Sequence, residues 1–204
     1  MAQRARTTPR KQAQQSRSQS TVDAILRATA RILVKEGYDH ASTNKIAIAA
    51  GVSVGSLYQY FPSKEALVAA LVEKHMAEMA EVIRREFIHL AAAPLEEAAH
   101  RAVKLMVEAH AIDPKLHKVL VEQVPRVGRL EQLEASEREF TELTRAYLEM
   151  HKHEIAVKNL DLAAFMIVRT VEALTHQAVL SQPEILGPAF TREVADMIVR
   201  YLRG

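Results

Sequence analysis

The sequence predicts an all-α fold in which a small N-terminal domain of about three helices precedes a larger bundle of about six. Apolar residues recur three and four positions apart through most of the 204 residues, which is the spacing that gives a helix one apolar face. Glycines and prolines interrupt this pattern at intervals typical of helix ends. No convincing strand pattern and no internal repeat are evident.

The chain begins with a basic segment, residues 1–19, that contains no acidic residue. Its apolar content is too low to offset the entropy lost on ordering, so we expect a disordered basic arm. Ser20, followed three residues later by Asp23, fits the start of a helix. Apolar residues then follow at helical spacing as far as Gly37, where the first helix is expected to stop.

Two short helices joined by a tight turn come next. Ser42 and Thr43 are both favourable N-caps for a helix over residues 44–50, and Gly51 can adopt the left-handed conformation that ends it. A third helix is predicted over residues 54–61. It must end there because Pro62 lacks an amide hydrogen and disfavours helical geometry at the preceding residue.

Further helices follow to the C-terminus. They are expected over residues 63–92, 95–111, 115–124, 129–153, 160–181 and 189–203. We therefore divide the chain into the arm at 1–19, a helix-turn-helix domain at 20–64 and a larger helical domain at 65–204.

Composition removes several classes of protein. The absence of cysteine excludes disulfide scaffolds, thiol nucleophiles and thiolate zinc sites. We predict no metal and no cofactor. The first 20 residues are polar and basic, and no run of about 18 apolar residues occurs, so we expect a cytoplasmic protein without membrane contact.

The net charge of +2 conceals an asymmetry along the chain. Residues 1–64 carry 10 Lys and Arg against 3 acids, whereas residues 65–204 carry 17 against 22. A basic region joined to an acidic one is typical of a chain whose basic part meets a polyanion. A merely solvated charge imbalance explains the composition equally well.

Residues 41–64, ASTNKIAIAAGVSVGSLYQYFPSK, contain no acidic residue and three of the chain's ten aromatic residues. On a helical wheel, the side of the third helix expected to pack inward comprises Val54, Leu57 and Phe61. The outward side comprises Gly55, Ser56 and Gln59. Short polar side chains suit a helix that enters the DNA major groove, which is about 12 Å wide, and contacts base edges.

A long motif runs through this segment. It comprises Thr43, Ile46-Ala47, Ala50-Gly51-Val52-Ser53, Gly55, Leu57-Tyr58, Tyr60-Phe61, Lys64-Glu65 and Leu67. The motif resembles the DNA-binding signature of the tetracycline-repressor (TetR) family of bacterial transcriptional regulators, over roughly residues 20–70. This resemblance implies a homodimer that binds double-stranded operator DNA, and a repressor that a small-molecule effector releases from that DNA.

The resemblance also implies individual roles. Contacts with DNA phosphates are implied for Thr43, Tyr58, Tyr60 and Lys64. Contacts with bases or the groove are implied for Asn44, Ser53, Val54, Gly55, Ser56 and Gln59. Asn44 stands where the family often has arginine or lysine, so a guanine contact is not implied there. Packing in a small core is the alternative role for the tyrosines.

Two other functions fit parts of the sequence. Gly51 to Gly55 match the G-x-S-x-G motif of hydrolases, in which the serine, here Ser53, is the nucleophile at a sharp turn called the nucleophile elbow. That elbow requires a preceding strand within a parallel sheet, which the sequence does not predict, so we expect no enzyme. The second alternative is a non-specific DNA-packaging protein, which would bind unrelated duplexes as tightly as any operator.

The larger domain carries two helices, expected over 160–181 and 189–203, that are apolar on most sides. This is typical of helices that pack on their own domain with one face and on a second subunit with another. The family resemblance implies a four-helix homodimer interface here. Central core helices of a monomer are the alternative.

We also predict an effector pocket, which makes 65–204 a ligand-binding and dimerisation domain. A polar stripe within 160–181, formed by Arg169, Glu172 and His176, would orient a largely apolar ligand. An exposed, ion-paired stripe is the alternative. Further candidates, for which plain core packing is the alternative, are Met106, His110, Phe140, Tyr147 and Phe165. His151 and His153 are two residues apart and point away from each other on a helix, so no metal is expected there.

Overall fold

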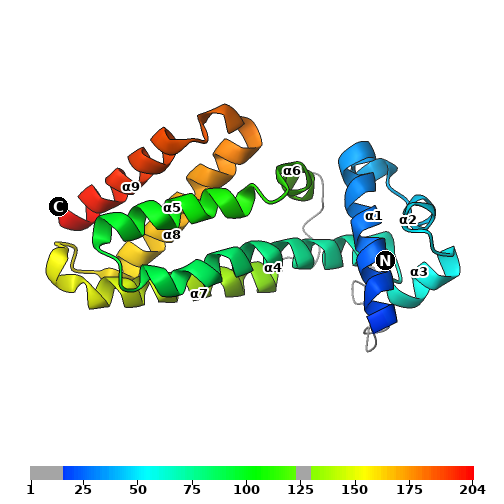
Figure 1. The fold of residues 1–204 in the computed structure, drawn as a ribbon, viewed down its shortest axis with the longest axis horizontal. Coiled ribbons are helices and arrows are strands. Elements are labelled where there is room, and N and C mark those ends of the chain that lie inside the picture. The colour runs from blue at the N-terminus through cyan, green and yellow to red at the C-terminus, as the bar shows by residue number, and fades with distance from the viewer. Residues whose placement is uncertain (1–15, 123–129) are drawn as a thin grey trace, which may run out of the picture. The chain divides into compact units, whose positions relative to one another are not determined.

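The computed structural model describes residues 16–122 and 130–204 (Figure 1). Within these two ranges it contains nine α-helices, two 3-10 turns and no strand, which confirms the predicted all-α class. The described residues divide into two compact units. The first unit comprises residues 16–76, 115–122 and 130–131, and the second comprises 77–114 and 132–204.

Helix α1, Ser16–His40, begins four residues before the start expected at Ser20. The predicted disordered arm is therefore wrong for residues 16–19, whereas 1–15 lie outside the described residues. Once a helix has formed, each residue added to its end gains one backbone hydrogen bond without a new cost of nucleation. Polar residues can therefore extend a helix that apolar residues anchor. Gly37, with φ 78° and ψ 170°, breaks the regular helix as predicted.

Local signals place α2, Thr43–Ala50, and α3, Val54–Tyr60. Gly51 ends α2 in the left-handed conformation, with φ 71° and ψ 29°. Phe61 is extended before Pro62, so α3 stops one residue earlier than predicted. The predicted helix, turn and helix are confirmed.

The remaining helices agree with the predicted ranges to within a few residues. They are α4 (Lys64–Leu90), α5 (Leu95–His110), α6 (Pro114–Glu122), α7 (Leu130–Met150), α8 (Leu160–Ser181) and α9 (Pro188–Arg203). The short 3-10 turns η1 (Lys152–Glu154) and η2 (Pro183–Ile185) connect three of them. No helix in the described ranges is long and apolar enough to cross a membrane.

The first unit has a core to which α6 contributes from far along the chain. Ile25 of α1, Leu57 of α3 and Leu67 of α4 are fully buried, and Leu120 of α6 joins them. A hydrogen bond between two buried histidines also links α4 to α6: His75 Nε2 lies 3.1 Å from His117 Nδ1. This compact unit is therefore larger than the domain expected at 20–64.

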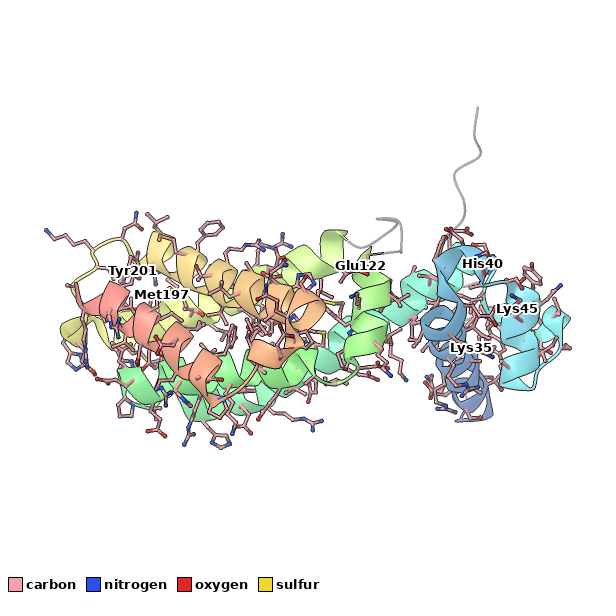
Figure 2. All side chains as sticks on the ribbon, turned by 90° about the horizontal axis from the view of Figure 1, so that it is seen from above. Lys35, His40, Lys45, Glu122, Met197 and Tyr201 are labelled. Carbon is pink, nitrogen blue, oxygen red and sulfur yellow. The ribbon has the colours of Figure 1, made fainter. Side chains whose placement is uncertain are left out.

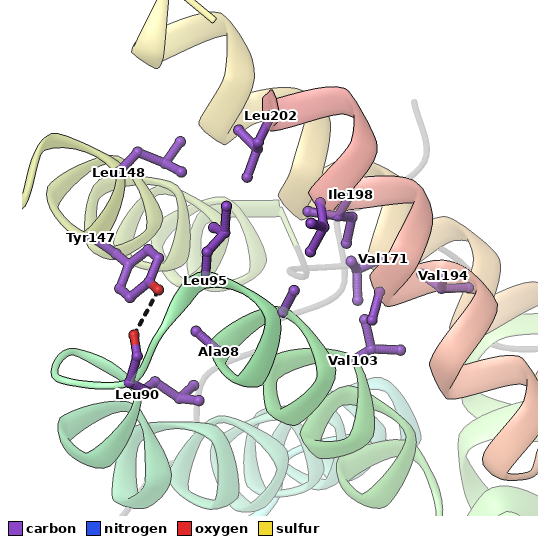
Figure 3. Close-up of a cluster of buried hydrophobic side chains, with 14 of the residues drawn as sticks. Leu90, Leu95, Ala98, Val103, Tyr147, Leu148, Val171, Val194, Ile198 and Leu202 are labelled. Carbon is purple, nitrogen blue, oxygen red and sulfur yellow. Dashed lines mark hydrogen bonds between the residues drawn. The ribbon is translucent and has the colours of Figure 1, made fainter. Parts of the chain in front are cut away.

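The second unit is built around α5, which packs against α8 and α9 (Figure 1). Figure 3 shows its core, in which Leu95, Val103 and Leu202 are buried together. The Tyr147 hydroxyl donates a hydrogen bond of 2.8 Å to the backbone carbonyl of Ala93, drawn as the dashed line. This bond ties α7 to the turn between α4 and α5.

Candidate functional site

The α2–α3 region is held by side-chain caps at both helix starts. Ser42 Oγ accepts a hydrogen bond from the Lys45 amide at 3.3 Å. Ser53 Oγ accepts one from the Ser56 amide at 3.0 Å, and the hydroxyls of Ser53 and Ser56 lie 2.8 Å apart. These caps satisfy amides that have no partner within their helix, and so fix where α2 and α3 begin.

We call Gly55, Ser56 and Gln59 the outward side of α3. Gly55 and Gln59 are exposed, and Ser56 is half-buried. On the opposite side Leu57 is fully buried and Phe61 nearly so. The inward packing expected of Val54 is wrong, since 36% of this residue is exposed. Val54 is the first residue of α3, so no earlier turn of the helix covers it.

Gly55 has space around it that the chain does not fill. A β-carbon placed on Gly55 would have Ser53 Oγ, at 3.9 Å, as its nearest neighbour, and its φ lies outside the left-handed range. Neither its backbone nor its packing within the chain therefore requires glycine. Glycine is a poor helix former compared with alanine, so a glycine that neither backbone nor packing requires, in the first turn of α3, is informative.

The tyrosines of α3 have different surroundings. Tyr58 is 39% exposed, and its hydroxyl lies 3.1 Å from the Thr43 hydroxyl at the start of α2. Tyr60 is half-buried and packs on the core of the first unit. The structure thus brings Thr43 and Tyr58 together, and it gives Tyr60 a packing role as well.

Two lysines near α3 are engaged with the protein. Lys64 Nζ donates to the Tyr38 carbonyl at 2.9 Å and lies 4.1 Å from the centre of the Tyr38 ring. Lys45, labelled in Figure 2, pairs with Glu36 and also donates to the His40 carbonyl at 3.0 Å. The hydrogen bond from Lys45 lowers the pKa of the Glu36 carboxyl below its usual value.

All ten residues predicted to contact DNA are accessible. Asn44, Ser53, Val54, Gly55, Tyr58 and Gln59 are exposed, and Thr43, Ser56, Tyr60 and Lys64 are half-buried. They belong to α2, α3, the cap of α3 and the first residue of α4. Their contact with DNA stays a prediction.

A small apolar cavity lies in the second unit. Its volume is about 70 Å³, and Tyr147, Thr144 and Ile167 are among the side chains that line it. Other lining residues come from α4, α5, α7 and α9: Leu90, Leu95, Ala98, Ala99, Ala102, Leu148, Ile198 and Leu202. Apart from Tyr147, none of them is among the predicted effector contacts, because periodicity does not separate residues beside a cavity from ordinary core residues.

The eight predicted effector contacts are distributed over α5, α7 and α8. Tyr147 borders the apolar cavity, whereas Phe165 and Arg169 border a groove between α7 and α8. His110 is buried and its Nδ1 donates to the Met106 carbonyl at 2.9 Å. Phe140 is half-buried on α7. Their contact with an effector stays a prediction.

The predicted polar stripe on α8 divides in the same way. Arg169 is exposed and pairs with both Glu137 of α7 and Glu172, the latter at 3.2 Å. Burial, reinforced by the charge of Glu137, raises the pKa of the Glu172 carboxyl. The His176 ring lies 5.8 Å from the His110 ring, centre to centre. The stripe thus runs from an ion-paired surface to a half-buried histidine.

The second unit also exposes large apolar side chains on its last two helices. We define the α8–α9 face as Leu162, Phe165, Met166, Leu174, Met197 and Tyr201, each at least 36% exposed. The two helices are linked within this face, because the Tyr201 hydroxyl lies 3.6 Å from Met166 Sδ. Figure 2 labels Met197 and Tyr201 on α9. Val171 and Ile198, on the same helices, are buried in the core.

No group of three or more metal-ligating side chains occurs in the described part of the chain. Ser53, the residue predicted as a nucleophile by the hydrolase motif, caps α3, and the described residues before it form the helix α2 and its turn. The strand that such an elbow requires is therefore replaced by a helix.

Comparisons with known families cover most of the described chain. Residues 25–71 match the family described as "Bacterial regulatory proteins, tetR family". Residues 94–202, more than half of the chain, match "Tetracyclin repressor-like, C-terminal domain". The two matches lie on the helix-turn-helix region and on the larger bundle.

Individual proteins are similar as well. The HTH-type transcriptional regulator YvkB of Bacillus subtilis (strain 168) is 32% identical over 84 residues, which are 38% of this chain and 44% of YvkB. The chain thus matches less than half the length of this curated relative. The fatty acid degradation regulator FadR of Bacillus halodurans has a TM-score of 0.66 and 25% identity, over 89% of this chain and 99% of FadR.

The fold agrees with more distant structures too. NalD of Pseudomonas aeruginosa, the secondary repressor of the MexAB-OprM multidrug efflux pump, has a TM-score of 0.71. It is 18% identical and covers 93% of this chain and 98% of NalD. At that identity the similarity concerns the fold alone.

Proposed function

Because the chain belongs to the tetR family of bacterial regulatory proteins, we propose that it is a homodimeric transcriptional regulator that binds operator DNA and responds to a small-molecule effector. The helix α3 enters the major groove with its outward side. The α8–α9 face joins two copies. The effector binds within the second unit and changes the distance between the two copies of α3.

The observation that carries this proposal is the open space at Gly55. The chain itself requires no glycine there, yet it has one on the exposed first turn of α3. A partner that approaches the α3 backbone closely explains the choice. The absence of acidic residues from 41–64 favours a partner rich in negative charge.

Dimer formation accounts for the α8–α9 face. Large apolar side chains gathered on two neighbouring helices mark a protein contact more often than a solvated surface. Tyr201 and Met166 make that face continuous across the two helices. A twofold dimer would place two α3 helices against half-sites about one DNA turn, or 34–36 Å, apart.

The apolar cavity favours a largely apolar effector. The groups that line it are almost all hydrocarbon, with hydroxyls only from Thr144 and Tyr147. At about 70 Å³ it is much smaller than ligand sites of roughly 300–1,000 Å³. An effector would therefore have to enlarge it, and that expansion supplies the two conformations that regulation requires. FadR, described as a regulator of fatty acid degradation, supports an effector of this chemistry.

The test of DNA binding is a substitution that spares the fold. Gly55→Leu should fold normally, because the added side chain starts in open space, but should weaken binding to a selected operator by at least about 100-fold. Gly187→Leu is the matched control, since a β-carbon on Gly187 meets nothing within 4 Å and one on Gly55 meets only Ser53 Oγ at 3.9 Å. Equal operator binding by Gly55→Leu, measured by fluorescence anisotropy, would overturn the proposal.

A further inference from the structure

The side chains on the outward side of α3 limit which DNA base this helix can contact. The inference about that base rests on the proposed function. Guanine is most often contacted by a bidentate arginine or by lysine. No arginine or lysine occurs from residue 46 to residue 63. Lys45 and Lys64, on either side of this stretch, are held by Glu36 and the His40 carbonyl and by Tyr38, respectively. Cationic reading of guanine by α3 is therefore disfavoured.

Most hydroxyls near α3 already have protein partners. The Ser53 and Ser56 hydroxyls bond to each other at 2.8 Å, and the Thr43 and Tyr58 hydroxyls lie 3.1 Å apart. The exposed amide of Gln59 makes no hydrogen bond within the described part of the chain. Its full donor and acceptor capacity thus remains for a partner.

The place of Gln59 on α3 suits a base contact. Gln59 follows Gly55 by four residues, so the two lie one above the other on the same side of the helix. The missing side chain at Gly55 lets the helix backbone approach, and the amide one turn later then reaches base edges. A carboxamide places a donor beside an acceptor, as adenine does in the major groove with N6 and N7.

We propose that Gln59 specifies an adenine in each operator half-site, donating its amide hydrogen to N7 and accepting from the N6 amino group, with Gly55 providing the close approach. Discrimination then comes from an uncharged side chain. The positive groups that the chain places nearby contribute affinity for phosphate rather than base identity.

The experiment begins with operators selected from random duplex DNA by the full-length protein. Each adenine of the best site is then replaced by 7-deazaadenine, which keeps the base pair and N6 but loses the N7 acceptor. Replacement of one particular adenine in each half-site should weaken wild-type binding by about 10-fold. This is the loss expected when one of the two hydrogen bonds of a bidentate contact is removed. Replacing the remaining adenines should change binding less than twofold.

Protein variants complete the cycle. Gln59→Ala should bind the unmodified operator more weakly and should be insensitive to 7-deazaadenine at that position. Gln59→Glu should shift the selected base pair towards cytosine, because the cytosine N4 amino group donates a hydrogen bond that a carboxylate accepts. Gln177→Ala, which changes an exposed glutamine of α8, should retain wild-type behaviour. Equal melting temperatures exclude misfolding.

The possible failures are distinguishable. If no sequence is enriched from random DNA and all duplexes bind alike, the proposed operator function is wrong. If a sequence is enriched but Gln59→Ala keeps the same sensitivity to 7-deazaadenine, or no adenine responds, the adenine contact alone is overturned.

Discussion

The outward side of α3 and the α8–α9 face are both exposed helix surfaces, but they are built from opposite kinds of side chain. The first offers a glycine, a serine and a glutamine, in a segment that contains no acidic residue. The second offers leucine, methionine and aromatic side chains, each at least 36% exposed. Exposure alone therefore identifies neither partner. The size and polarity of the exposed groups separate a surface for a hydrated polyanion from one for another protein.

The two surfaces should act independently of each other. A change on one surface should remove one partner and leave the other interaction intact when that interaction is measured separately. The four changes below range from loss of the dimer to a modest loss of stability.

Met197→Glu should have the largest effect. In a twofold interface the change buries two unpaired carboxylates, and each buried unpaired charge costs several kcal/mol. We expect the dimer dissociation constant, measured by sedimentation equilibrium, to rise at least about 1,000-fold. Met150→Glu is the matched control, because Met150 is 55% exposed on α7 and lies outside the α8–α9 face. An unchanged dimer in Met197→Glu would show that another surface joins the copies.

Tyr58→Phe should weaken DNA binding without affecting the dimer. It removes a hydroxyl that lies 3.1 Å from the Thr43 hydroxyl and that can donate to a phosphate oxygen while it accepts from Thr43. We expect about a 10- to 100-fold loss for operator and unrelated duplexes alike, equivalent to one hydrogen bond to a charged group at about 1.5–3 kcal/mol. Tyr201→Phe, which removes a hydroxyl from the α8–α9 face, should leave the affinity per dimer unchanged. A loss confined to the operator would instead assign Tyr58 to base reading.

The sequence could predict what short-range signals determine. Gly51, Pro62 and the serine caps act within a few residues, and they placed α2 and α3 almost without error. Ser16–Gln19 carry no apolar signal, so the early start of α1 was missed. The contribution of α6 to the first unit depends on packing between residues far apart in the chain, such as Leu120 and Leu57. No local pattern contains that information.

The effector site shows the same limit more strongly. The wheel placed Arg169 beside Glu172 correctly, but it could not reveal Glu137, a partner from another helix that draws Arg169 into a surface pair. Tyr147 was found because it lies on an apolar face, whereas its neighbours at the cavity resemble every other core residue. The motif around α3 could be recognised from the sequence because its exposed residues are small or uncharged and include no acidic residue, unlike those of an ordinary surface helix.

Lys64→Met should affect both the DNA affinity and the folding stability of the first unit, and the two effects can be measured separately. If Lys64 leaves Tyr38 to neutralise a phosphate, the slope of log K against log salt concentration should fall by about one unit for any duplex. Loss of the contacts with the Tyr38 ring and carbonyl should also lower stability by about 1 kcal/mol. Lys152→Met, an exposed lysine of the second unit, should change neither quantity. An unchanged salt slope with reduced stability would leave Lys64 a purely structural role.

Tyr147→Phe should have the smallest effect, and only on the second unit. Losing the bond to the Ala93 carbonyl should cost about 1 kcal/mol of stability near neutral pH, with dimer and operator affinity unchanged. Burial, with smaller contributions from Glu154 and Glu96, raises the pKa of Tyr147 to about 12 from 10.0. Because the unfolded chain ionises first, the wild-type protein should lose stability as the pH rises from 10.0 towards about 12, and Tyr147→Phe should lack that part of the loss. Tyr201→Phe retains Tyr147 and should show the wild-type decline. Parallel curves for Tyr147→Phe and wild type in alkaline urea titrations would show that the hydroxyl is not kept neutral by the fold.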